Sequence, residues 1–246
     1  MSKKNAGQSR SERASAALAE QRRRERTRRL MLIGGVVVGL LIVVVGAFVV
    51  QSQRTTVGAK ARSVPNGLTG GYGVVVGRAS APTTLRVYED FQCPICDQFE
   101  KTTGDRLRAA VAAGKVKIDY RMVSFLDRAS TNNYSSRALN AAAVVLDTSG
   151  TDTFVKFHQL LFDSQPAEGT AGPTDSQLVD LAVRAGASRS AVQSGIENGE
   201  FAQWVTNTQG AMSKAGVNGT PTVFVNGKKA GASLQQSIDA ALQAAG

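Results

Sequence analysis

Two cysteines separated by two residues are the part of this sequence best suited to chemistry. Cys93 and Cys96 enclose Pro94 and Ile95 in a Cys-X-X-Cys motif, and the chain of 246 residues has no other cysteine. At the start of a helix, residues i and i+3 lie one turn apart on one face, close enough to form a disulfide. The spacing therefore predicts a pair that cycles between dithiol and disulfide.

The motif also predicts which sulfur reacts first. Pro94 suits the first position of a helix, because its missing N–H would have no partner there, and Cys93 then occupies the N-cap. Unpaired N–H groups and the positive end of the helix dipole favour a thiolate at that position. We therefore predict that Cys93 is the nucleophile and that Cys96, less exposed, is the resolving thiol that breaks a mixed disulfide.

Two other roles for the cysteine pair are weaker. A structural zinc site would need two further ligands, and the sequence offers only His158 and carboxylates, so no metal is predicted. An inert disulfide would close a loop too short to constrain the unfolded chain much. His158 lies among apolar residues at helical spacing and is predicted to be packed in the core. No cofactor is expected beyond the redox-active disulfide itself.

The elements around the motif indicate an α/β domain with a central sheet. Strands are predicted at 72–76, 84–88 and 116–123, and a helix from 94 to about 113 that Gly104 should break. An inserted helical block spans about 132–216, with helices predicted at 138–146, 154–162, 176–185, 190–197 and 201–215. A strand at 222–225, a turn at 226–227 and a helix at 234–245 complete the domain.

The amino-terminal part predicts a membrane anchor. Of the net charge of +10, residues 1–29 carry +7, so the basic excess lies in a tail and not on the folded domain, which argues against nucleic-acid binding. Residues 30–50 are uncharged and long enough for a transmembrane helix. The positive-inside bias predicts a cytoplasmic tail that contacts lipid and an extracytoplasmic domain. Residues 51–71 are predicted to be a flexible linker.

A cleaved signal peptide is the alternative for this segment. Ala59-Lys60-Ala61 fits a cleavage pattern of small residues. The apolar run, however, exceeds the roughly 7–15 residues of a signal core, which favours a signal-anchor.

Two stretches of the sequence resemble a known family. Residues 87–99, Val-Tyr-Glu-Asp-Phe-Gln-Cys-Pro-Ile-Cys-Asp-Gln-Phe, are similar to the strand, active site and helix start of DsbA-like thiol:disulfide oxidoreductases of the thioredoxin superfamily. Residues 217–227, Val-Asn-Gly-Thr-Pro-Thr-Val-Phe-Val-Asn-Gly, resemble their cis-proline loop and following strand. The resemblance covers about 72–246. It implies a thioredoxin-like fold with an inserted helical subdomain, and a cis Thr220-Pro221 bond beside the sulfurs, where the Thr220 backbone pairs with a client segment.

The sequence departs from the family pattern in two places. Many thioredoxin-fold proteins have a buried acid six residues before the first cysteine, where this chain has Val87. Strongly oxidising members have His before the second cysteine, where this chain has Ile95, and Asp97 adds a negative charge nearby. Both features predict a disulfide less oxidising than about −120 mV.

The resemblance and the predicted topology together favour an oxidase that introduces disulfides into exported, cysteine-containing client proteins. A membrane partner of the DsbB or vitamin K epoxide reductase-like type would reoxidise it. The alternatives are a disulfide reductase or isomerase, and a membrane-anchored binding or chaperone module whose cysteine pair is not catalytic.

Overall fold

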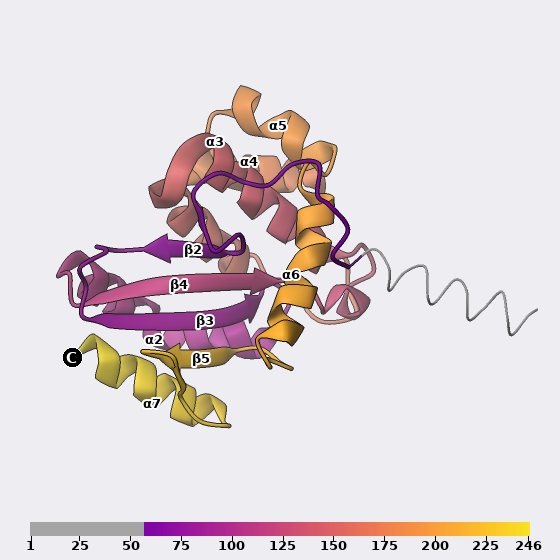
Figure 1. Cartoon of the computed structure of the whole chain (residues 1–246). Coiled ribbons are helices and arrows are strands. Elements are labelled where there is room, and N and C mark those ends of the chain that lie inside the picture. Colours follow the sequence, from indigo (N-terminus) through magenta and orange to yellow (C-terminus); the bar gives the residue numbers. More distant parts are fainter. Residues whose placement is uncertain (1–56) are drawn as a thin grey trace, which may run out of the picture. The chain divides into compact units, whose positions relative to one another are not determined.

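The strands form one mixed sheet of six. The computed structural model describes residues 57–246, and Figure 1 shows the labelled strands lying side by side. The strand order is β1-β2-β4-β3-β5-β6. Strands β3 and β4 are parallel, and every other neighbouring pair is antiparallel. The strands are β1 (Leu68–Thr69), β2 (Gly73–Val76), β3 (Thr83–Asp90), β4 (Val116–Val123), β5 (Thr222–Val225) and β6 (Lys228–Lys229). The predicted α/β architecture with a central sheet is confirmed.

Strands β3 and β4 form the centre of the sheet because their side chains are apolar on both faces. Leu85 and Val87 of β3 and Val116 of β4 are fully buried. A parallel pair covered on both sides is typical of a sheet with helices on each face. The carboxyl end of β3 is therefore fixed, and the cysteine motif follows it directly.

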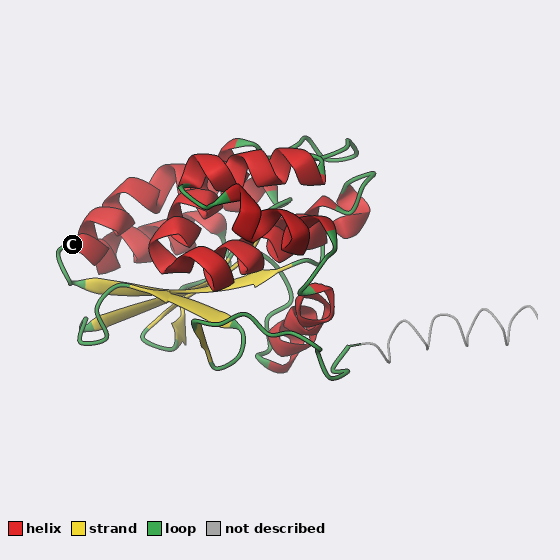
Figure 2. Cartoon of the chain, turned by 90° about the horizontal axis from the view of Figure 1, so that it is seen from above, coloured by secondary structure: helices red, strands yellow, loops and turns green. Residues whose placement is uncertain are grey.

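Helices cover both faces of this sheet. Helix α6 (Ala202–Lys214) crosses the face in front in Figure 1, and α2 (Pro94–Ala112) lies behind it with α7 (Leu234–Ala245) packed beside it. Figure 2 shows that most helices gather on one face. The remaining elements of the insert are η1 (Asp127–Ala129), α3 (Tyr134–Asp163), α4 (Asp175–Ala185) and α5 (Arg189–Glu197).

Two glycines lie inside helices, and only one of them interrupts its helix. Gly104 does not break α2, because the apolar face of this helix continues from Phe99 through Leu107 into the core. A Cβ at Gly104 would lie 2.9 Å from the Arg108 guanidinium, so a small residue fits there. The two helices predicted at 138–146 and 154–162 are both present within α3, on either side of a kink at Gly150, whose φ of 76° favours glycine.

Residues 57–71, predicted to belong to a flexible linker, are hydrogen-bonded to helix α6. The Asn207 side chain accepts a hydrogen bond from the Gly58 N–H at 2.7 Å and donates one to the Ala59 carbonyl at 2.9 Å. The Trp204 indole donates to the Gly71 carbonyl at 2.8 Å. Polar side chains of α6 thus hold a segment that has too few apolar residues to form a core of its own. Residues 51–56 lie outside the described part of the chain.

The predicted tail (1–29) and transmembrane helix (30–50) also lie outside the described residues. Among residues 57–246, no helix combines the length and the apolar character that crossing a membrane requires.

Candidate active site

Cys93 lies at the amino-terminal end of α2, as the sequence predicts. It is the N-cap residue, Pro94 opens the helix, and the N–H groups of Cys96 and Asp97 donate to the Cys93 carbonyl at 3.0 and 3.2 Å. The Cys93 side chain makes no capping hydrogen bond to the helix backbone. Its sulfur therefore lies among helix-start N–H groups and remains free to react with a partner.

The loop before β5 brings the second predicted segment to this sulfur. Tyr88 of β3 pairs with Thr222 of β5, so the ends of the two strands meet. The Thr220-Pro221 peptide is cis, as the resemblance implies. The Cys93 thiol donates to the Thr220 carbonyl at 3.5 Å across 127 positions of sequence. The structure therefore brings together all the predicted site residues at the edge where β3 ends.

The environment of Cys93 favours its ionised form. The Cys96 thiol donates a hydrogen bond to the Cys93 sulfur and lowers the pKa of Cys93 from 9.0 to about 6, although burial acts in the opposite direction. The Thr220 side chain and the N–H groups of Cys96 and Ile95 make smaller contributions to the same lowering. The Thr220 hydroxyl is buried and has no other partner among the described residues, so it is available to the sulfur.

The environment of Cys96 favours the protonated thiol instead. Cys96 is 0% exposed, and burial raises its pKa well above 9.0, with further increases from the hydrogen bond to Cys93 and from the charge of Glu89. One thiol is therefore reactive near neutral pH and the other is held protonated. Asp97, predicted to oppose the thiolate, is paired with Lys101 at 2.7 Å, which offsets its charge.

A buried carboxyl group is present near the cysteines, although not where the family pattern has one. Val87 is an apolar core residue, and Glu89, two positions later, is fully buried. Burial raises the pKa of Glu89 to about 8. The Glu89 carboxylate lies 3.1 Å from the imidazole of His158, which is packed among aromatic rings as predicted. Glu100, on α2, lies beside them, and the sequence reasoning did not single it out.

Asp90 fixes the turn that carries the cysteine motif. Its carboxylate accepts hydrogen bonds from the Gln92 N–H at 2.9 Å, the Leu126 N–H at 3.0 Å and the Ser135 hydroxyl at 2.6 Å. Burial nevertheless raises its pKa to about 6. The turn is therefore tied both to the loop after β4 and to α3.

Gln165, just after α3, was missed by the sequence reasoning. Its side-chain amide donates to the carbonyls of Phe91 and Cys93 at 2.8 and 3.1 Å. A single residue of the helical insert thus holds both sides of the reactive turn. A polar residue in a loop 72 positions away gives no local sign of this role.

A groove runs beside the reactive sulfur. It has a volume of about 190 Å³, and its walls include Ile95, Thr220, Pro221, Lys229 and Leu234. Ile95 is 47% exposed, which is high for a large apolar side chain. The groove has the position and the apolar rim needed to hold an extended segment against the Thr220 backbone.

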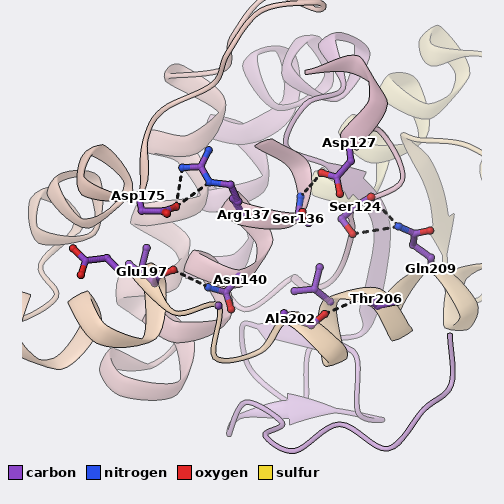
Figure 3. A pocket seen from close by; sticks show the side chains of 13 residues that line it. Ser124, Asp127, Ser136, Arg137, Asn140, Asp175, Glu197, Ala202, Thr206 and Gln209 are labelled. Carbon is purple, nitrogen blue, oxygen red and sulfur yellow. Dashed lines mark hydrogen bonds and ion pairs between the residues drawn. The ribbon is translucent and has the colours of Figure 1, made fainter. Parts of the chain in front are cut away.

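A larger cavity, of about 280 Å³, lies away from the cysteines between η1, α3, α5 and α6 (Figure 3). Its polar groups mostly pair with one another: Arg137 with Asp175, and Gln209 with Ser124. It contains no thiol, and none of the predicted site residues lines it.

The comparisons with known proteins agree with this geometry. A family model described as Thioredoxin matches residues 69–244. The chain belongs to the thioredoxin family. Within it, the chain resembles the DsbA-like oxidoreductases, as the motifs predict. The structure of reduced DsbA from Mycobacterium tuberculosis is 33% identical, with a TM-score of 0.59, and the match covers 72% of this chain and 100% of that one.

Two further matches extend the comparison. The reduced disulfide bond oxidoreductase DsbG from Mycobacterium tuberculosis is 35% identical, with a TM-score of 0.59, and the match covers 70% of this chain and 93% of that one. The serine/threonine-protein kinase PknE from the same organism is 33% identical over 159 residues, 62% of this chain. This match spans only 28% of the length of that kinase.

Proposed function

We propose that this chain is a thiol:disulfide oxidoreductase in which Cys93 is the nucleophile and Cys96 the resolving thiol. The observation that carries the proposal is the contrast between the two sulfurs. Cys93 has a pKa lowered to about 6 beside the Thr220 carbonyl, whereas Cys96 is fully buried with a raised pKa. The membership in the thioredoxin family and the similarity to DsbA and DsbG support the same activity.

The proposed reaction is a pair of thiol–disulfide exchanges. A client thiolate attacks the Cys93 sulfur of the Cys93–Cys96 disulfide, a client–Cys93 disulfide forms, and Cys96 leaves and takes up a proton. A second client thiolate then attacks the client sulfur of this mixed disulfide, and Cys93 leaves as a thiolate. Two electrons pass from the client to the cysteine pair. Because the leaving sulfur has a low pKa, the second exchange is favoured.

Client proteins would bind in the groove beside Pro221. An extended segment can pair with the exposed backbone of Thr220 as an added strand, while its cysteine faces Cys93. Ile95 supplies an apolar contact at the rim. Backbone pairing does not depend on the side chains of the client, so many client sequences would be accepted.

The direction that we propose is oxidation. A low pKa of the nucleophilic cysteine stabilises the dithiol and makes the disulfide a better oxidant. The value of about 6 lies between about 3.5 in the strongly oxidising DsbA and about 7 in thioredoxin. A moderately oxidising pair fits the prediction from Ile95. A reductase or isomerase is the alternative within the same chemistry.

We also propose that the domain is anchored in the cell membrane by residues 30–50 and faces outward, where disulfides persist. Its clients would be exported proteins, and a membrane protein of the DsbB or vitamin K epoxide reductase-like type would reoxidise it. The charge distribution around the apolar run supports this topology. A reporter enzyme active only in the cytoplasm, fused after Gly246, should then be inactive, and activity would contradict the topology.

The decisive test of direction is the redox state of the cysteine pair in intact cells, together with its equilibrium with glutathione. An oxidase is expected to be mostly disulfide at steady state, and a pair found mostly as dithiol would favour a reductase. If a Cys93→Ser variant supported client folding as well as the parent, the domain would act as a binding or chaperone module.

A further inference from the structure

Three ligand-type side chains meet behind the cysteine pair, and the exchange reaction uses none of them as a nucleophile. Glu89 comes from β3, Glu100 from α2 and His158 from α3. One oxygen or nitrogen atom of each lies within 4.8 Å of the others. Three elements far apart in sequence thus converge on one point.

The two carboxyl groups lack donors that would stabilise them. One oxygen of Glu89 faces His158 Nε2 at 3.1 Å, but its other oxygen is buried without a partner, as is one oxygen of Glu100, within residues 57–246. Oxygen atoms of the two carboxyl groups lie within 4.8 Å of each other. Carboxylate oxygens only accept hydrogen bonds, so a proton or a cation must lie between them. Because Glu89 is 0% exposed, an uncompensated charge there would be costly.

The three ligand atoms are of the types that bind a divalent cation of the zinc class. One imidazole nitrogen and two carboxylate oxygens are common zinc ligands, and three protein ligands leave a fourth position open. A divalent cation also neutralises two carboxylates. Ligand atoms around a tetrahedral zinc ion lie about 3.3 Å apart, so a contraction of about 1.5 Å at most is needed from the present 4.8 Å limit. Glu100 can make this movement, since it is the least buried of the three.

A cavity borders one member of the cluster. Glu100 lines a cavity of about 170 Å³ between α2 and α3, away from the client groove. Its ionisable lining residues are mostly acidic: Asp97, Glu100, Asp105 and Asp163, against Lys101 and Arg108. This balance attracts cations.

We propose that Glu89, Glu100 and His158 bind one divalent cation of the zinc class, with its open coordination position toward this cavity. The aromatic rings of Phe91, Tyr120 and Phe162 around His158 hold the imidazole in place. Neither sulfur belongs to the proposed ligand set.

The test uses the full chain with Cys93→Ser and Cys96→Ser, prepared without a polyhistidine tag, so that thiols and tags cannot bind the metal. Titration with Co²⁺ should give one ion per chain and the visible absorption of tetrahedral cobalt, and Zn²⁺ should displace it. Adding Glu100→Gln should weaken Co²⁺ binding by at least ~10-fold. This residue lies on the cavity side of the cluster, so the change should preserve the fold.

Asp105→Asn is the matched control. Asp105 lines the same cavity on the same helix but lies outside the cluster, so its loss should change the affinity less than twofold. Equal effects of Glu100→Gln and Asp105→Asn would overturn the proposal, because they would indicate diffuse attraction to acidic groups. Absence of saturable one-to-one binding would also overturn it, and would leave a carboxyl pair that shares a proton.

Discussion

The two sulfurs of the motif lie one helical turn apart, but their surroundings differ in every respect that affects ionisation. Cys93, at the helix start, is surrounded by donors from Cys96, Thr220 and the backbone, and its pKa is lowered to about 6. Cys96, inside the helix, is buried next to the carboxyl group of Glu89, and its pKa is raised. Both residues are cysteines, so their positions relative to the start of α2 determine which is the nucleophile and which is the resolving thiol.

The largest expected effect comes from removing each sulfur in turn. Cys93→Ser should reduce exchange of the reduced protein with a client disulfide by at least ~10³-fold, because the ionised nucleophile is lost. Cys96→Ser should keep the attack of the Cys93 thiolate on the client disulfide, which releases one client thiolate. It should then accumulate a client–Cys93 mixed disulfide, detected on non-reducing gels. If the mixed disulfide formed instead through Cys96 in the Cys93→Ser variant, the two roles would be reversed.

The lowered pKa of Cys93 also predicts how the stability of the reduced protein depends on pH. Because folding lowers the pKa of Cys93 from 9.0 to about 6, its thiolate stabilises the reduced fold fully above pH 9, and this contribution is lost as the pH falls through 6. Between pH 5 and pH 8, reduced wild type should therefore gain about 2 kcal/mol in unfolding free energy over Cys93→Ser. Denaturant titrations at both pH values measure this difference, and a constant difference would contradict the lowered pKa.

A smaller effect is expected at Thr220. Thr220→Val keeps the shape of the side chain but removes the hydroxyl, so the pKa of Cys93 should rise by about one unit. The pH dependence of alkylation or of thiolate absorbance reports this value. Thr102→Val, which removes an exposed hydroxyl elsewhere on α2, should leave it unchanged. Equal shifts in both variants would mean that the hydroxyl does not act on the sulfur.

The smallest effect should come from Gln165→Ala. Two hydrogen bonds to the reactive turn are lost, so the unfolding free energy should fall by about 1 kcal/mol and the exchange rate by a few-fold. Gln159→Ala, at an exposed position on α3, is the control. A normal exchange rate in Gln165→Ala would show that the turn keeps its geometry without this contact.

The sequence predicted those parts that depend on local patterns. The strands at 116–123 and 222–225 and the helix at 234–245 match their predicted bounds, because apolar alternation and a capping box mark their limits. The position of Cys93 at the helix start followed from Pro94 alone. The cis Thr220-Pro221 bond came only from the family resemblance.

The parts that could not be predicted depend on contacts between distant residues. Residues 57–71 resemble a linker because their composition is polar, and they are held by distant contacts such as those of Asn207 and Trp204 of α6. Glu100 has the sequence context of an ordinary helix-surface residue. Its neighbours Glu89 and His158 are revealed only when β3, α2 and α3 pack together.

The pairing of Tyr88 with Thr222 has a consequence for how such a domain can change over evolutionary time. The pairing brings together Cys93 and Thr220, which are 127 positions apart in the sequence. The entropic cost of closing a loop rises only with the logarithm of the loop length. The helices between β4 and β5 can therefore be lengthened, trimmed or resurfaced at little thermodynamic penalty, provided that the few contacts such as Gln165 persist. New client preferences could arise there while the sulfur chemistry stays constant.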